Sequence, residues 1–131
     1  RRWIGVSTHS VAQITAATED GASYVGFGPC FATPTKGYAE GKPIEEIAEA
    51  VRACQLPLFA IGGIHAANLP QLLRAGVRRI AVSSAILQAD DPEAAARELC
   101  AILRARRMPV QAAPAAAEAP AQAMSIASPN E

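Results

Sequence analysis

The sequence predicts an α/β fold built on a parallel sheet, and two observations carry this prediction. Four short apolar runs alternate with four segments whose apolar residues recur at helical spacing, which is the pattern of successive β–α units. The chain has 131 residues and half of them are hydrophobic, which is enough for one domain with a buried core. A four-strand doubly wound sheet and half of a (β/α)8 barrel both fit this order of elements.

The first two β–α units are expected within residues 3–54. The runs WIGVS (residues 3–7) and YVGFG (residues 24–28) are the expected strands. Ser10 is a good N-cap for the first helix, with Gln13 three residues later, and Gly21 is placed to end that helix. The second helix is indicated by apolar residues at helical spacing, namely Ile44, Ile47, Ala48 and Val51.

Two further units and a tail complete the chain. The runs PLFAIGG (residues 57–63) and RRIAVSS (residues 78–84) are the third and fourth expected strands. Gly76 closes a third helix, and Asp91 with Pro92 opens the last one. The residues expected to face the core from these helices are Leu69, Leu72, Leu73, Ala95, Leu99, Ile102 and Leu103. We expect one half-barrel domain over residues 1–107, and a disordered Ala- and Pro-rich tail over residues 108–131.

Composition excludes several classes of function. Twelve basic and twelve acidic side chains give a net charge near zero, which argues against a general nucleic-acid binder. No apolar run approaches the ~18 residues of a membrane helix, and no signal peptide is visible. Cys30, Cys54 and Cys100 lie far apart without metal-ligand spacing, as expected for reduced thiols in a cytoplasmic protein.

Polar residues gather where the four predicted strands end, and the carboxyl ends of parallel strands are where α/β folds place their chemistry. These ends carry Ser7-Thr8-His9, residues 28–36, Gly62-Gly63 and Ser83-Ser84. Taken singly, Gly62-Gly63 could only permit a tight turn and Ser83-Ser84 could only cap the turn after its strand. Because Gly62-Gly63 and Ser83-Ser84 follow adjacent strands, they favour a phosphate site between the last two strands of a (β/α)8 barrel. The chain then corresponds to strands five to eight, the C-terminal half of such a barrel.

The loop GPCFATPTKGYAEG (residues 28–41) combines hydroxyls, backbone N–H groups and one ammonium, and together these donors could bind an anion. Its sequence GYAEGKP faintly resembles a nucleotide-binding P-loop. The glycine spacing is one residue short, however, and Pro43 replaces the required Ser or Thr. The loop is therefore expected to bind an anion without being a P-loop.

Four motifs resemble those of the thiamine phosphate synthase family in order and spacing: GVSTHS, YVGFGPCFATPTK, AIGGI and AVSSAI followed by ADDPEAA. The resemblance covers about residues 4–103. It implies a (β/α)8 barrel of the thiamine phosphate synthase/thiazole tautomerase group. It also implies a transferase of thiamine biosynthesis that joins a hydroxymethylpyrimidine pyrophosphate to a thiazole phosphate, releasing pyrophosphate.

The resemblance also implies roles for individual residues. Ser7 and Lys36 are expected to contact the departing pyrophosphate, with Lys36 as the catalytic cation where negative charge develops. The residues expected on the thiazole side are Thr33, Pro34 and Thr35, and those expected to hold the thiazole phosphate are Gly63, Ser83 and Ser84. His9 is a possible participant, because thiazole tautomerases use a histidine of the matching stretch in proton transfer. Cys30 is expected to serve packing, and His65 to begin a helix.

Two departures from the family pattern matter. The loop after Lys36 is shorter than in typical members, so the cover over the pyrophosphate is expected to close differently. Strands one to four are missing, and in the family they carry the pyrimidine pocket and the aspartates that bind Mg2+. We therefore expect no metal ligand in this chain, and an inactive piece that needs its N-terminal half or a partner chain. The alternatives are a thiazole tautomerase and a non-catalytic half barrel that binds phosphate.

Overall fold

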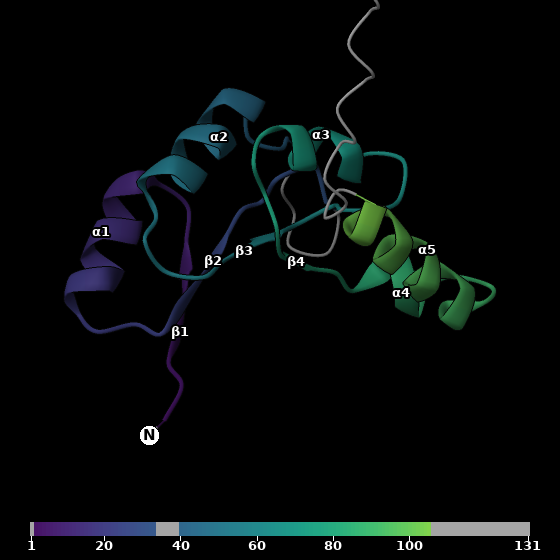
Figure 1. The fold of residues 1–131 in the computed structure, drawn as a ribbon, viewed down its shortest axis with the longest axis horizontal. Coiled ribbons are helices and arrows are strands. Elements are labelled where there is room, and N and C mark those ends of the chain that lie inside the picture. The colour runs from purple at the N-terminus through teal and green to yellow at the C-terminus, as the bar shows by residue number, and fades with distance from the viewer. Residues whose placement is uncertain (1, 34–39, 106–131) are drawn as a thin grey trace, which may run out of the picture.

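A computed structural model of the chain describes residues 2–33 and 40–105, and its centre is a four-stranded parallel sheet. The strands lie side by side in chain order, as Figure 1 shows. They are β1 (Gly5–Thr8), β2 (Tyr24–Phe27), β3 (Leu58–Ile61) and β4 (Ile80–Ala81). Every adjacent pair is parallel. The predicted parallel α/β fold is therefore confirmed.

Each strand is followed by a helix, and the helices form an arc on one side of the sheet (Figure 1). They are α1 (Val11–Glu19), α2 (Ile44–Ala53), α3 (Leu69–Arg74), α4 (Ser84–Leu87) and α5 (Pro92–Ala105). The short helix α4 begins at the second of the two serines, with Ser83 as its N-cap residue. The strand order without reversal, with all connections passing over one face, is the arrangement of consecutive units in a β/α barrel.

Side-chain caps fix the starts of two helices as predicted. The Ser10 hydroxyl accepts a hydrogen bond of 3.2 Å from the Gln13 amide, and the Gln13 side chain accepts one of 2.7 Å from the His9 amide. At α5 the Asp91 carboxylate accepts a bond of 2.9 Å from the Ala94 amide, with Pro92 in the first turn. Each cap satisfies an N–H group that the helix leaves without an internal partner.

The core lies between the sheet and the helices. Strand residues alternate, so that Val25 and Phe27 of β2 point toward the helices and are fully buried. They belong to the same buried cluster as Ile47 of α2 and, from α3, Leu69 and Leu72, which are also fully buried. Burying each such side chain contributes about 1.5–3 kcal/mol, so this layer is the main source of stability.

The opposite face of the sheet is apolar and largely exposed. Tyr24 lies across Gly5, where a Cβ atom would come within 2.1 Å of the tyrosine ring, and it meets the Phe59 ring edge-on at 5.6 Å. Trp3 keeps 79% of its surface exposed and Ile61 keeps 45%. Within the described residues, β1 pairs only with β2 and β4 only with β3, so both edges of the sheet are open.

The fourth strand is shorter than predicted. The sequence favours a strand over residues 78–84, whereas β4 pairs with β3 through two residues, Ile80 and Ala81. β4 ends there because β3 ends at Ile61, opposite Ala81, and because Ser83, at φ −129° and ψ −79°, leaves the extended region and starts α4. Among the described residues, no helix has the length and apolar character to cross a membrane. The predicted tail, residues 108–131, lies outside the described residues.

Candidate anion-binding site at the strand ends

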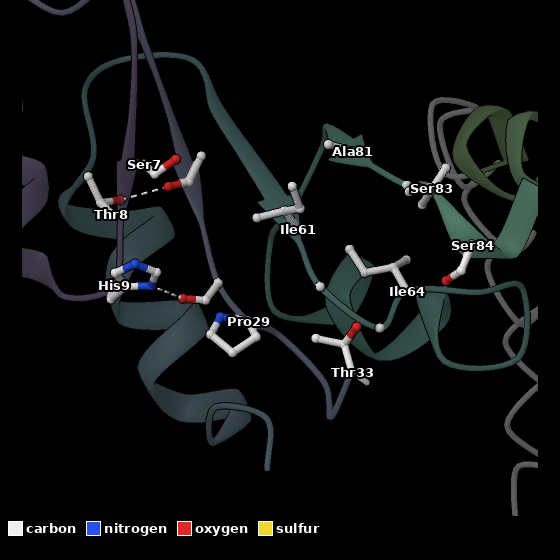
Figure 2. Close-up of a pocket in the computed structure, with 15 residues that line it drawn as sticks. Ser7, Thr8, His9, Pro29, Thr33, Ile61, Ile64, Ala81, Ser83 and Ser84 are labelled. Atoms are coloured by element: carbon white, nitrogen blue, oxygen red, sulfur yellow. Dashed lines mark hydrogen bonds between the residues drawn. The ribbon is translucent and has the colours of Figure 1, made fainter. Parts of the chain in front are cut away.

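A cavity of about 390 Å³ lies at the carboxyl ends of all four strands. Its walls carry Ser7 from β1, Gly63 and Ile64 after β3, and Ser83 and Ser84 after β4. Figure 2 shows these residues around one space, with the two serines on the side opposite Ser7. These strand-end residues, which the sequence predicted at one edge of the sheet, therefore line a single cavity.

The turn after β3 requires two glycines. Gly62 and Gly63 have φ values of +102° and +61°, a region that residues with a Cβ rarely adopt. A Cβ on Gly63 would also lie 2.4 Å from the Ala32 carbonyl oxygen. The turn is pressed against the loop after β2, since the Phe31 amide donates a bond of 3.1 Å to the Gly62 carbonyl. These glycines therefore both turn the chain and bring its backbone to the cavity.

Ser83 and Ser84 follow β4 after one intervening residue, Val82, and are both exposed on the cavity wall. Ser83 is the N-cap residue of α4, yet its side chain makes no capping hydrogen bond. The interpretation in which this serine only caps the turn thus has no support in the geometry. Two hydroxyls beside a glycine turn are donors of the kind that oxyanions accept.

The β1 side of the cavity is held by two hydrogen bonds to the neighbouring strand. The buried Thr8 hydroxyl donates to the Gly26 carbonyl at 2.9 Å. His9 Nδ1 lies 2.7 Å from the Gly28 carbonyl oxygen, and because a carbonyl can only accept, Nδ1 carries the proton of this bond (Figure 2). These two contacts hold the C-terminal end of β1, which carries Ser7, against the end of β2.

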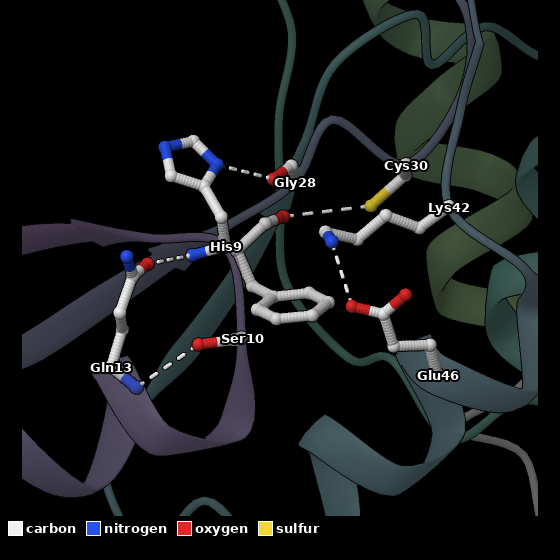
Figure 3. A network of polar contacts seen from close by, with 8 residues as sticks. His9, Ser10, Gln13, Gly28, Cys30, Lys42 and Glu46 are labelled. Carbon is white, nitrogen blue, oxygen red and sulfur yellow. Dashed lines mark hydrogen bonds and ion pairs between the residues drawn. The ribbon is translucent and has the colours of Figure 1, made fainter.

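The predicted loop is described only in part. Thr33 lines the cavity, whereas Pro34, Thr35 and Lys36 lie outside the described residues. Another lysine, Lys42, is engaged away from the cavity. Its ammonium pairs with Glu46 at 2.7 Å and lies 5.4 Å from the centre of the Phe27 ring (Figure 3). Lys42 therefore fastens the end of this loop to α2.

Cys30 lies in the same loop and is buried. Its thiol donates a long hydrogen bond of 3.5 Å to the Phe27 carbonyl. Burial away from water raises the pKa of Cys30 to about 11, outweighing the Ile61 backbone hydrogen bond and the nearby Lys42 charge, which lower it. A thiol held neutral in the core agrees with the predicted packing role, because the thiolate is the reactive form.

Sequence reasoning missed part of the cavity wall. Gly26, Ile61 and Ala81 line it from the exposed face of the sheet, at alternate positions along the strands from the polar ends. The period of two along each strand was the signal that could have identified them. No group of three or more His, Cys, Asp or Glu within the described ranges is arranged to hold a metal ion.

Comparison with known proteins identifies what the chain is similar to. The family model described as thiamine monophosphate synthase matches residues 1–86. The thiamine-phosphate synthase of Synechococcus sp. (strain WH7803) is 48% identical over 100 residues, covering 76% of this chain and 28% of that protein. The thiamine-phosphate synthase of Mycobacterium sp. (strain JLS) is 51% identical over 100 residues, covering 76% and 44%. The chain therefore spans less than half the length of these relatives.

Solved structures give the same result. A thiamine phosphate pyrophosphorylase from Pyrococcus furiosus superimposes with a TM-score of 0.70 at 35% identity, covering 78% of this chain and 48% of that one. A structure described as native KDPGal has a TM-score of 0.55 at 21% identity, which shows a shared fold alone. Because the family model covers most of the described residues, the chain belongs to the thiamine monophosphate synthase family.

Proposed function

We propose that this chain is the C-terminal half, strands five to eight, of a thiamine phosphate synthase barrel. The complete protein would join a hydroxymethylpyrimidine pyrophosphate to a thiazole phosphate and release pyrophosphate. Three observations support this proposal: the family match, the partial coverage of the relatives, and a four-stranded parallel sheet whose two edges pair with no other described strand. The exposed apolar face with Trp3 and Ile61 is where the remaining half, or a partner chain, would close the barrel.

The observation that carries the proposal is the meeting of Gly63, Ser83 and Ser84 at one cavity on adjacent strands. Backbone N–H groups at a glycine turn and serine hydroxyls bind an oxyanion without needing a formal positive charge. We assign this side of the cavity to the thiazole phosphate. In (β/α)8 barrels a phosphate site between the last two strand ends is common, which agrees with this assignment.

The other side of the cavity is assigned to the pyrophosphate and the thiazole ring. Ser7 stands on the β1 rim, across from the two serines, and Thr33 lines the wall between them. We assign Ser7 and Lys36 to the departing pyrophosphate, and Thr33, Pro34 and Thr35 to the ring. A lysine that neutralises charge on a leaving group stabilises the transition state more than the ground state.

Mg2+ is the cofactor that this reaction implies. The described residues offer no carboxylate cluster for it, so we propose that its ligands belong to the remainder of the complete protein. The role of this chain is then to bind and orient the two phosphate groups. His9 remains the residue on which the alternative activity, thiazole tautomerisation, would depend.

A chimera tests the proposed function. The matching segment of the Mycobacterium sp. (strain JLS) relative is replaced by residues 4–103 of this chain, and the purified protein is supplied with both substrates and Mg2+. Formation of thiamine phosphate supports the synthase. Isomerisation of the thiazole without condensation would assign the tautomerase, and a folded chimera with neither activity would leave a non-catalytic phosphate-binding half barrel.

Two lysine variants of the chimera test the role of Lys36. Lys36→Gln removes the proposed cation and should lower kcat by about 10²–10³-fold, the usual cost of losing one group that stabilises developing charge. Lys42→Gln is the matched control, because Lys42 is bound to Glu46 away from the cavity. It should lower thermal stability while leaving kcat within about twofold of the parent. Equal kcat values for the two variants would contradict the assignment.

A further inference from the structure

We infer that Asn68 is a positioning residue for the phosphate, acting through the backbone of the turn after β3. This inference rests on the phosphate site of the proposed function and adds to it a residue outside the cavity. Asn68 lies just before α3, and its side chain makes two hydrogen bonds. Its Nδ2 donates to the Gly63 carbonyl at 2.8 Å, and its Oδ1 accepts from the His65 amide at 2.9 Å.

The first of these bonds sets the direction of an N–H group. In a trans peptide the carbonyl and the following N–H point in opposite directions. Because the Gly63 carbonyl is held by Asn68, the Ile64 N–H is turned away from Asn68. Gly63 and Ile64 both line the cavity, whereas Asn68 does not. Asn68 thus acts on the ligand through the peptide between Gly63 and Ile64.

The preceding peptide is held in the same way. The Phe31 amide donates to the Gly62 carbonyl at 3.1 Å, which fixes the peptide that carries the Gly63 N–H. Among the hydrogen bonds between described residues, neither the Gly63 nor the Ile64 amide is a donor. Two successive N–H groups, each on a peptide whose carbonyl is held by a hydrogen bond, can form the kind of concave arrangement that binds anions.

Asn68 is the part of this arrangement that mutation can remove. The bond from Phe31 is made by backbone alone, so truncating a side chain does not abolish it. Glycines at positive φ have other conformations available at little cost, so the bonds from Phe31 and Asn68 help to keep the turn in one of them. Removing the Asn68 amide should therefore leave the fold in place while letting the Gly63–Ile64 peptide rotate, which costs affinity by loss of preorganisation.

The test is a titration of the 131-residue chain with inorganic phosphate, followed by the amide NMR signals of Gly63 and Ile64. Asn68→Ala removes both bonds. Asn68→Asp keeps an acceptor for His65 and loses the donor to Gly63. Gln71→Ala, which truncates an exposed side chain in the helix that Asn68 precedes, is the matched control. Titrations at low and high salt separate any effect of the aspartate charge, which salt screens, from loss of orientation.

We expect Asn68→Ala and Asn68→Asp to weaken phosphate binding by about tenfold at high salt, with Gln71→Ala unchanged. Equal dissociation constants for the parent and the Asp variant would overturn the inference. They would show that the bond to the Gly63 carbonyl does not affect phosphate binding and that Asn68 only helps to start α3. The Asp variant decides the question if the Ala variant does not fold. Absence of saturable shifts at Gly63 and Ile64 in the parent would contradict the phosphate site itself.

Discussion

At the scale of single residues, Gly63 shows how a backbone requirement and a binding site coincide. Its φ of +61° and the Ala32 oxygen, 2.4 Å from any added Cβ, are separate reasons for glycine. Gly63→Ala should lower the free energy of unfolding by about 2–4 kcal/mol, from positive φ plus a backbone clash. Gly21→Ala, at φ +83° with nothing within 4 Å, should lose about 1 kcal/mol. Urea unfolding measures both, and equal losses would contradict the clash.

Cys30 gives a prediction about pH. Its pKa is raised from 9.0 to about 11 in the folded chain, so between these values the unfolded state releases a proton that the folded state keeps. The free energy that burial of the neutral thiol contributes to folding is therefore fully present below pH 9, and it declines as the pH rises toward 11. The unfolding free energy of the parent, relative to Cys30→Ala, should fall by about 2 kcal/mol from pH 8 to pH 11. A constant difference would mean that the thiol is solvated.

At the scale of elements, the caps decide where helices start. Ser10 supplies the hydroxyl that accepts from the Gln13 amide at α1. Ser10→Ala should lower the free energy of unfolding by about 1 kcal/mol, and Ser10→Asp, which keeps an acceptor, should retain most of it. Chemical denaturation of the three proteins measures this. If both variants lost the same stability, the loss would come from packing and not from the cap.

The elements could largely be predicted from the sequence because their signals are local. Helical spacing with Ser10 and Asp91 as caps depends on neighbours a few residues apart, and those helix starts are confirmed. The length of β4 could not be predicted from neighbouring residues, because it depends on how many residues of β3 lie beside it. Asn68 was missed for a similar reason: its two hydrogen bonds are set by the three-dimensional path of a glycine turn.

At the scale of the whole molecule, one face of the sheet is covered and the other is not. The helices bury the outward-facing side chains of the strands, while Trp3 and Ile61 stay exposed on the face that a barrel would enclose. The gathering of polar residues at the strand ends follows from the parallel topology, so Ser7, Gly63, Ser83 and Ser84 could be placed together from sequence. Their roles depend on the ligand and stay predictions, as does that of Lys36, which lies outside the described residues.

The central claim is that this chain holds the thiazole phosphate by its phosphate group. The most direct test is an NMR titration of the 131-residue chain with thiazole phosphate and, separately, with the corresponding thiazole alcohol. We predict saturable shifts at the amides of Gly63, Ile64, Ser83 and Ser84 with the phosphate ester, and none there with the alcohol at the same concentration. Shifts of equal size with both compounds, or shifts confined to other residues, would contradict the claim.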